Sequence, residues 1–116
     1  MFIYRVENSE GVGPFSKAAL LRVKHKIFRR SSGFPNPIND GIAFKKGLHY
    51  CGCKSEWQLR RWFDKRSREI MFKSQKGDLF FTIYEVDPAY VIHGKKQIVF
   101  EKHKAKQLVK LPLNRI

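Results

Sequence analysis

The sequence predicts a single α+β domain over residues 1–116, in which two main helices cover one face of a four- or five-stranded, mostly antiparallel sheet. The length of 116 residues is typical of one domain. Hydrophobic residues make up 42% of the chain and include ten Phe, four Tyr and two Trp, which is enough apolar surface for one core. Segments with strand and helix periodicity follow one another along the chain, so we expect an ordered mixture of both.

The first strand is predicted over residues 2–7, which are aromatic and β-branched with partial alternation, and a turn-rich loop follows over 8–14. In an extended strand Arg5 and Glu7 share a face with Ile3, so we expect that face to be at least partly polar. The first helix is predicted over 16–29, because apolar residues recur there at helical spacing behind a serine that can cap it.

The segment 31–41 holds two Pro, two Asn and two Gly, and it predicts a loop. A short strand is expected over 48–53. Ser55 then begins the second helix with a Ser-Glu-Trp-Gln capping box, in which Gln58 can return a hydrogen bond to the cap. A further turn or helix is expected over 68–73. The buried stripe of the second helix is predicted to be Leu59, Trp62 and Phe63.

The strongest strand pattern covers 79–86, which is apolar on both faces over most of its length and therefore predicts the centre of the sheet. Two further short strands, 90–93 and 97–101, flank Gly-Lys-Lys and predict a β-hairpin. The segment 102–116 is basic and weakly periodic, and we expect a short helix and a partly flexible tail there.

The charge is strongly unbalanced, because 24 Lys and Arg stand against ten Asp and Glu, which gives a net charge of +14. The excess falls in three blocks: six positive residues without an acid in 16–30, eight against three acids in 54–76, and seven against one in 95–116. Such a surplus destabilises the compact state by self-repulsion, and it is typical of proteins that meet a polyanion.

We therefore predict a noncatalytic protein that engages nucleic acid, DNA or RNA, through phosphate contacts made by helical faces. Four of the eight basic residues of the second block are Arg, which favours planar, bidentate contacts with phosphate or carboxylate groups. Trp57 lies off the predicted buried stripe and is the aromatic side chain that we expect to stack on a base. The predicted binding residues are Arg22, Lys24, Lys26, Arg29, Arg30, Trp57, Arg60, Arg61, Lys65 and Arg66.

Two other interpretations of the same charge stay open. The basic faces can instead steer association with an acidic protein, such as a host enzyme that the domain inhibits. They can also be merely solvated, which is the usual role of a single run of charge. The sequence distinguishes neither DNA from RNA nor one oligomeric state from another.

His49, Cys51 and Cys53 form an H-x-C-x-C run whose side chains share one face of an extended strand. This spacing differs from the C-x-x-C turns of structural zinc sites, so we expect buried, reduced thiols and no metal or cofactor. The first residues lack a basic segment followed by a long apolar one, and no stretch has the length of a membrane span. We expect a cytoplasmic protein that has no membrane partner.

Several motifs together resemble a family of small proteins from tailed bacteriophages and prophages. This resemblance brings no activity with it, and implies an accessory protein of a class in which binding to host machinery is common. The motifs are Ile3-Tyr-Arg-Val-Glu7, Gly11-Val-Gly-Pro-Phe15, Cys51-Gly-Cys-Lys-Ser55 with Gln58-Leu59 and Trp62-Phe63, Ile83-Tyr-Glu-Val86, and Gly94 to Phe100.

A second pattern, Arg5 followed by Ser55 and then Glu101, is similar to the arginine, serine and glutamate order of ADP-ribosyltransferases. The serine-threonine-serine stretch of that superfamily is absent here, and Val99 stands where its second acidic or amide residue would be. An enzyme is therefore the least favoured alternative. In the simpler interpretation Ser55 only caps a helix, and Arg5 pairs with Glu101 across a sheet face.

Overall fold

In the computed structural model, which describes residues 1–14 and 37–116, the chain forms six strands and two α-helices. Short 3-10 turns cover Pro88–Tyr90, Lys102–Lys104 and Leu113–Arg115. The strands and helices are β1 (Phe2–Glu7), β2 (His49–Gly52), α2 (Glu56–Trp62), α3 (Lys65–Ser74), β3 (Phe80–Glu85), β4 (Val91–His93), β5 (Ile98–Glu101) and β6 (Lys106–Pro112).

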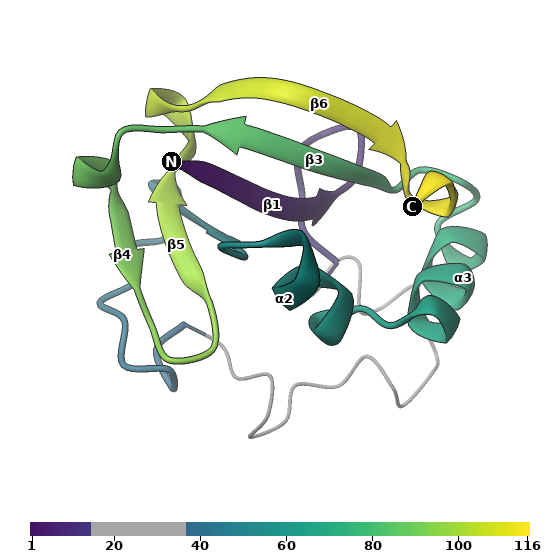
Figure 1. The fold of residues 1–116 in the computed structure, drawn as a ribbon, viewed down its shortest axis with the longest axis horizontal. Helices are drawn as coiled ribbons and strands as arrows, with labels where there is room; N and C mark the ends of the chain where they lie inside the picture. The colour runs from purple at the N-terminus through teal and green to yellow at the C-terminus, as the bar shows by residue number, and fades with distance from the viewer. Residues whose placement is uncertain (15–36) are drawn as a thin grey trace.

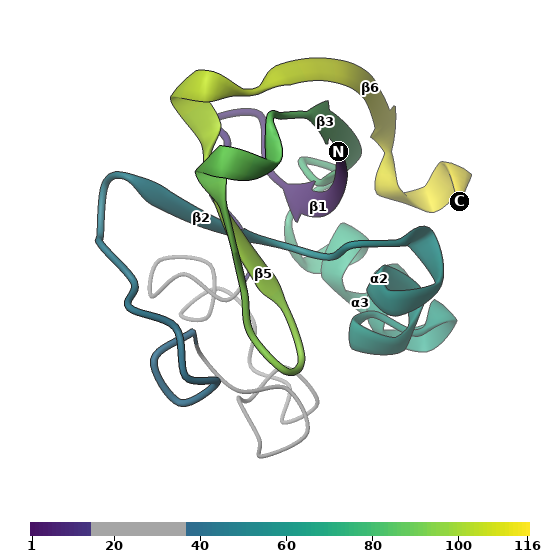
Figure 2. The ribbon, with the colours of Figure 1, turned by 60° about the vertical axis from the view of Figure 1, so that its left-hand side comes forward.

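The strands form two antiparallel sheets of three strands each, in the orders β1-β3-β6 and β2-β5-β4. Figure 1 shows β1, β3 and β6 running across the view while β4 and β5 run down it, so the two sheets cross steeply. Figure 2 shows the chain leaving β2 and passing beside β1 before it enters α2. This passage places residues of both sheets next to each other.

Among the residues that the structure describes, one antiparallel bridge joins the sheets, where Tyr4 and Cys53 exchange backbone hydrogen bonds of 2.9 and 2.7 Å. Gly52 makes this close approach feasible, because a Cβ atom there would collide with the side chain of Ile3 and lie 3.6 Å from the ring of Phe100. The crossing point therefore depends on the absence of a side chain at residue 52.

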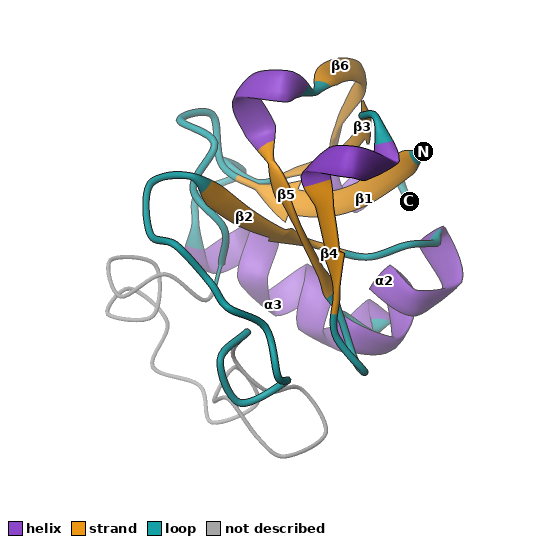
Figure 3. Ribbon diagram, turned by 90° about the vertical axis from the view of Figure 1, so that its left-hand side faces the viewer, coloured by secondary structure: helices purple, strands orange, loops and turns teal. Residues whose placement is uncertain are grey.

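The core has two layers, which lie on opposite faces of β1 and β3. Val6 and Phe81 point into a cluster with Leu59 of α2 and Met71 of α3. The alternating residues point the other way, into a cluster with Ile98 and Phe100 of β5; these residues are Ile3 and Tyr84. Figure 3 shows α2 and α3 gathered beneath β1 and β2, with β4 and β5 crossing in front of them.

The predicted α+β class is confirmed, and the predicted single sheet of four or five strands is replaced by two smaller sheets. The prediction that 79–86 lies at a sheet centre is confirmed, because β3 pairs with β1 on one side and β6 on the other. The hairpin is confirmed in β4 and β5. The predicted helix over 16–29 lies outside the described residues.

The second helix begins as predicted, and the chain beyond it differs in detail. Ser55 caps α2 by accepting a hydrogen bond of 3.0 Å from the backbone N–H of Gln58, but the Gln58 side chain accepts from Lys54 rather than from the cap. A separate helix α3 starts at residue 65, earlier than expected, because Asp64 caps it through the N–H of Ser67.

The structure shows an additional strand at the C-terminal end. Residues 106–112, which looked only weakly periodic in the sequence, form β6 at the edge of the first sheet. Lys106 and Lys110 are exposed on this strand, but so are Leu108 and Leu111, so buried and exposed side chains do not alternate regularly. Lysines are typical of a protected sheet edge. The expected short helix corresponds to the 3-10 turn over Leu113–Arg115.

Candidate functional site

The first candidate site is the exposed surface of α2 and α3. Trp57 is 68% exposed, and the guanidinium carbon of Arg61 lies 5.0 Å from the centre of its ring. The pair therefore presents an aromatic face and a planar cation together at the surface. We call Trp57, Arg60, Arg61, Lys65 and Arg66, all of which are exposed, the helical basic surface.

The charges of the helical basic surface are little neutralised. Arg60 is 3.8 Å from Glu56 one turn earlier, but both side chains are about half exposed, and such pairs contribute about 0–1 kcal/mol. Within the described part of the chain, no ion pair engages Arg61, Lys65 or Arg66. These three cations are accordingly the ones available to an anionic partner.

Arg68 belongs to the same charge block and has a different role. Its side chain is buried and donates a 2.7 Å hydrogen bond to the carbonyl of Phe63 at the end of α2. Burial, with a smaller contribution from the charge of Arg60, lowers the pKa of this guanidinium below its usual value. Arg68 therefore ties α3 to the end of α2, whereas the cations of the helical basic surface are exposed.

The other five predicted binding residues, Arg22, Lys24, Lys26, Arg29 and Arg30, lie outside the described residues. Of the predicted residues that the structure describes, it places Arg61 against Trp57 on α2, and it exposes Arg60 on α2 and Lys65 and Arg66 at the start of α3. Trp57 is exposed, apart from the buried stripe, as predicted. Leu59 and Phe63 are buried as predicted, with Trp62 partly covered.

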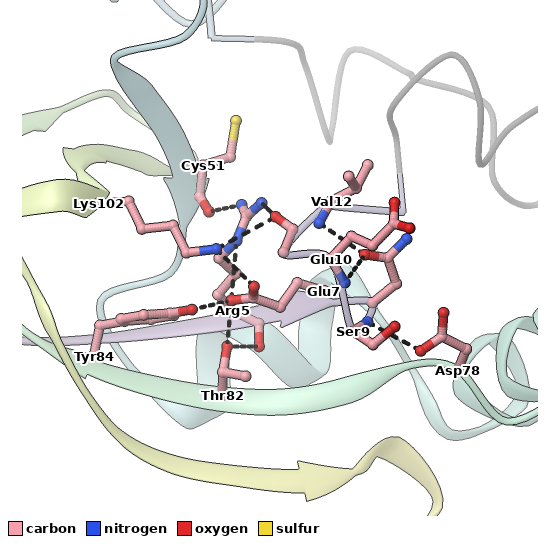
Figure 4. A network of polar contacts seen from close by, with 12 residues as sticks. Arg5, Glu7, Ser9, Glu10, Val12, Cys51, Asp78, Thr82, Tyr84 and Lys102 are labelled. Atoms are coloured by element: carbon pink, nitrogen blue, oxygen red, sulfur yellow. Dashed lines mark hydrogen bonds and ion pairs between the residues drawn. The ribbon is translucent and has the colours of Figure 1, made fainter.

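The second candidate site is a network of polar side chains where the two sheets cross (Figure 4). Arg5 and Glu7 are only 6% and 4% exposed, although their strand face was expected to be partly polar. Glu7 accepts a hydrogen bond of 2.8 Å from the ammonium group of Lys102, together with hydrogen bonds from the hydroxyls of Tyr84 and Thr82. Two cations therefore share one buried carboxylate, because the Arg5 Nε atom is also 3.5 Å from Glu7.

Electrostatics keep Glu7 ionised in this network. Burial acts to raise the pKa of its carboxyl, but hydrogen bonds from Lys102 and Tyr84 and the positive charge of Arg5 outweigh burial and lower the pKa below 4.5. Burial and the hydrogen bond to Glu7 raise the pKa of the Tyr84 hydroxyl, which therefore keeps its proton. The network accordingly carries a net charge of about +1 from its three ionised groups, by counting two cations and one anion.

Arg5 is held by the backbone of two other segments. It donates to the carbonyl of Cys51 at 2.6 Å and to the carbonyl of Gly11 at 3.0 Å. Its buried Nε has no hydrogen-bond partner among the residues that the structure describes. The cation is therefore fixed in position while part of its donor capacity is unused.

The Arg5 network borders a cleft of about 650 Å³ at the sheet junction. Arg5, Lys46 and Lys102 contribute positive charge to its lining and Glu10 contributes one negative charge. Most of the remaining wall is apolar or aromatic, and the guanidinium of Arg5 lies 5.3 Å from the ring centre of Tyr50. The aromatic side chains of the wall are Tyr4, Phe44, Tyr50, Trp62 and Phe63.

His49, Cys51 and Cys53 all line the cleft at this junction. In residues 1–14 and 37–116, no group of three or more His, Cys, Asp and Glu has an arrangement suited to a metal ion. Both cysteines are thiols, and burial raises the pKa of Cys53 to about 12, with a smaller effect from Cys51. The Nδ1 atom of His49 accepts a hydrogen bond from the backbone of Lys45 at 3.0 Å.

The residues of the enzyme pattern have separate local partners. Ser55 caps α2, as the simpler interpretation predicted. The expected pairing of Arg5 with Glu101 is wrong, because Arg5 pairs with Glu7 and the carboxylate of Glu101 lies 3.7 Å from His103. No helix in the described ranges is long and apolar enough to cross a bilayer.

The fold and its two candidate sites define a small α+β protein with a basic helical surface and a cleft between crossed sheets. Residues 1–114 match the family model described as Bacteriophage T4 Y00F protein, and the chain belongs to this family. The predicted resemblance to phage proteins is thereby confirmed. No curated protein and no solved structure matches the chain.

The sequence reasoning missed the second site. The sequence placed Arg5 and Glu7 on a partly polar strand face and paired Arg5 with Glu101, and it indicated Lys102 only as part of a basic segment. The available signal was an Arg and a Glu on the same face of an otherwise apolar strand, because such charges are rarely buried without partners.

Proposed function

We propose that this phage-family protein is a noncatalytic accessory protein that binds nucleic acid through the helical basic surface, acting in the host cytoplasm. The observation that carries the proposal is the pairing of an exposed Trp57 with Arg61 on α2, followed by exposed Lys65 and Arg66 in the first turn of α3. An exposed tryptophan has a flat face on which any base can stack, and base stacking contributes about 1–3 kcal/mol per base. The neighbouring cations can neutralise phosphates and release their counterions.

The arrangement favours single strands over duplexes. The bases of a single strand are open to stacking, whereas those of a duplex are already stacked on one another. The helical basic surface offers phosphate contacts without an arrangement that would read base edges, so we expect weak sequence preference. The basic segment at 102–116 adds nonspecific attraction.

Fluorescence anisotropy with labelled single-stranded DNA, single-stranded RNA and duplex DNA tests the proposal. We expect Trp57→Ala to weaken single-strand binding by about fivefold or more, and Arg61→Gln/Arg66→Gln to weaken binding of every nucleic acid. The matched control is Lys104→Gln/Lys106→Gln, which removes the same charge from exposed positions of another segment and should weaken binding less. Equal losses in both double variants would show that net charge, rather than this surface, attracts the ligand.

An acidic host protein is the second candidate partner, and the same residues favour it. Exposed Trp and Arg are the side chains that most often dominate protein interfaces. Pull-down from host lysate after nuclease treatment separates the two candidates. A partner that is retained without nucleic acid and lost in Trp57→Ala would support protein binding and contradict the nucleic-acid proposal.

A further inference from the structure

We propose that the cleft between the two sheets binds a free nucleotide, with Arg5 and Lys102 facing its phosphate groups and the aromatic wall covering its base. The cleft is formed by the sheet junction and not by the exposed faces of α2 and α3. The inference therefore goes beyond nucleic-acid binding at the helical basic surface and does not depend on it.

The first reason is charge. Arg5 and Lys102 both line the cleft, and both share the buried carboxylate of Glu7. Two positive charges therefore share one negative charge, which leaves one positive charge in excess beside the cleft. Lys46 and Glu10 also line the cleft and add one formal charge of each sign. The excess charge favours an anionic ligand.

The second reason is hydrogen-bonding capacity. An arginine has five N–H donors, and within the described residues two of those of Arg5 have acceptors, both of them backbone carbonyls. The Lys102 ammonium has three donors; one reaches Glu7 at 2.8 Å and another is 3.5 Å from the Gly11 carbonyl. A phosphate group has acceptor oxygens for the donors that are left, and charge-assisted bonds of this kind are the strong ones.

The third reason is the shape and lining of the remaining space. A volume of about 650 Å³ lies within the range of small-molecule sites, and it is far larger than a bare inorganic anion. Phe44 and Tyr50 supply aromatic surface in the same cleft as the two cations. A nucleotide has the matching combination, an aromatic base joined to a charged phosphate.

Isothermal titration calorimetry with the full chain tests this proposal, using ADP, GDP, CDP and UDP, with adenosine and inorganic phosphate as partial ligands. We expect at least one diphosphate to bind with a Kd below about 1 mM and to raise the Tm of the protein. Adenosine and inorganic phosphate should each bind at least about tenfold more weakly than that diphosphate, since each lacks one half of the recognised chemistry.

Lys102→Gln should weaken diphosphate binding by about tenfold or more, because it removes a charged donor, whereas Lys104→Gln two residues later should change it by less than about twofold. Fluorescence of Trp62 in a Trp57→Phe background provides a second readout at the cleft. If Lys102→Gln fails to fold, two other measurements test the nucleotide proposal. One is the comparison with adenosine and inorganic phosphate. The other is Lys46→Gln, which is expected to weaken diphosphate binding more than Lys104→Gln does.

Two results would overturn the inference. One is that none of the four diphosphates binds or shifts the Tm. The other is that adenosine or phosphate alone binds as tightly as the best diphosphate. Arg61→Gln/Arg66→Gln should leave diphosphate binding unchanged, so failure of this proposal and failure of the nucleic-acid proposal are distinguishable.

Discussion

Replacing Glu7 by glutamine should destabilise the fold more than any other conservative change to an acid in the described part of the chain. The carboxylate is 4% exposed and faces Lys102 at 2.8 Å and Arg5 at 3.5 Å. The variant keeps the shape of the side chain but leaves both cations without their shared anion. Breaking a buried ion pair by removing one partner costs about 3–5 kcal/mol.

The lower end of that range applies here, because the Lys102 side chain is 23% exposed and water can rehydrate part of its charge. We therefore expect a loss of about 3 kcal/mol in the free energy of unfolding. At about 4 °C for each kcal/mol, which suits a chain of this length, the Tm should fall by about 12 °C.

Urea and thermal unfolding followed by circular dichroism measure both quantities. The matched control is Glu85→Gln, which removes the same charge from an exposed position on β3 and should change stability by less than about 0.5 kcal/mol. If Glu7→Gln were no more destabilising than this control, the ion pairs of Glu7 with Arg5 and Lys102 would not stabilise the junction of the two sheets.

Other predictions concern pH and the backbone. Since the pKa of Glu7 is lowered in the fold, its stabilisation is present above pH 4.5 and is lost as the pH falls through the folded-state pKa, which an acid titration of the Tm will show. Since the pKa of Cys53 is raised from 9.0 to about 12, stability should fall as the pH rises above 9, and Cys53→Ala should reduce that fall. Gly52→Ala should lower the free energy of unfolding, measured in urea, by about 2 kcal/mol or more, because the added Cβ atom would collide with Ile3. Gly41→Ala is the control, because a Cβ atom there meets open space and only the positive φ of the backbone opposes it. Asp40→Ala should cost about 2–3 kcal/mol and increase hydrogen exchange at the β4–β5 turn, because its carboxylate accepts from the backbone N–H groups of residues 95–97.

Local patterns allowed much of the secondary structure to be predicted. The apolar run of β3 indicated a central strand because only a strand covered on both sides is apolar on both faces. The capping serine of α2 and the hairpin of β4 and β5 are likewise determined by neighbouring residues. These elements were found because the information that specifies them lies within a few residues.

The arrangement of the strands could not be predicted in the same way. Whether β1 continues into one sheet with β2 or crosses it depends on the bridge between Tyr4 and Cys53 and on the space left by Gly52. Both are contacts between distant parts of the chain. Alternation along a strand shows that it has two faces, but not which strand lies beside it.

The same reason explains the unequal prediction of the two candidate sites. The helical basic surface lies on consecutive elements, so a run of charge and an off-stripe Trp57 were visible in the sequence. The buried network joins Glu7 to Lys102, which are 95 residues apart. Nothing in either local segment indicates that the other is its partner.

The central claim, that the helical basic surface binds phosphates, is tested most directly by the salt dependence of its affinity for a single-stranded oligonucleotide. A plot of log K against log salt for the wild-type chain should have a negative slope. Arg61→Gln/Arg66→Gln should reduce the magnitude of that slope by about 1.4, because each neutralised phosphate of a single strand contributes about 0.7 and the variant leaves two phosphates without their cations. An affinity that does not change with salt, or a slope that is the same in the variant, would contradict the claim.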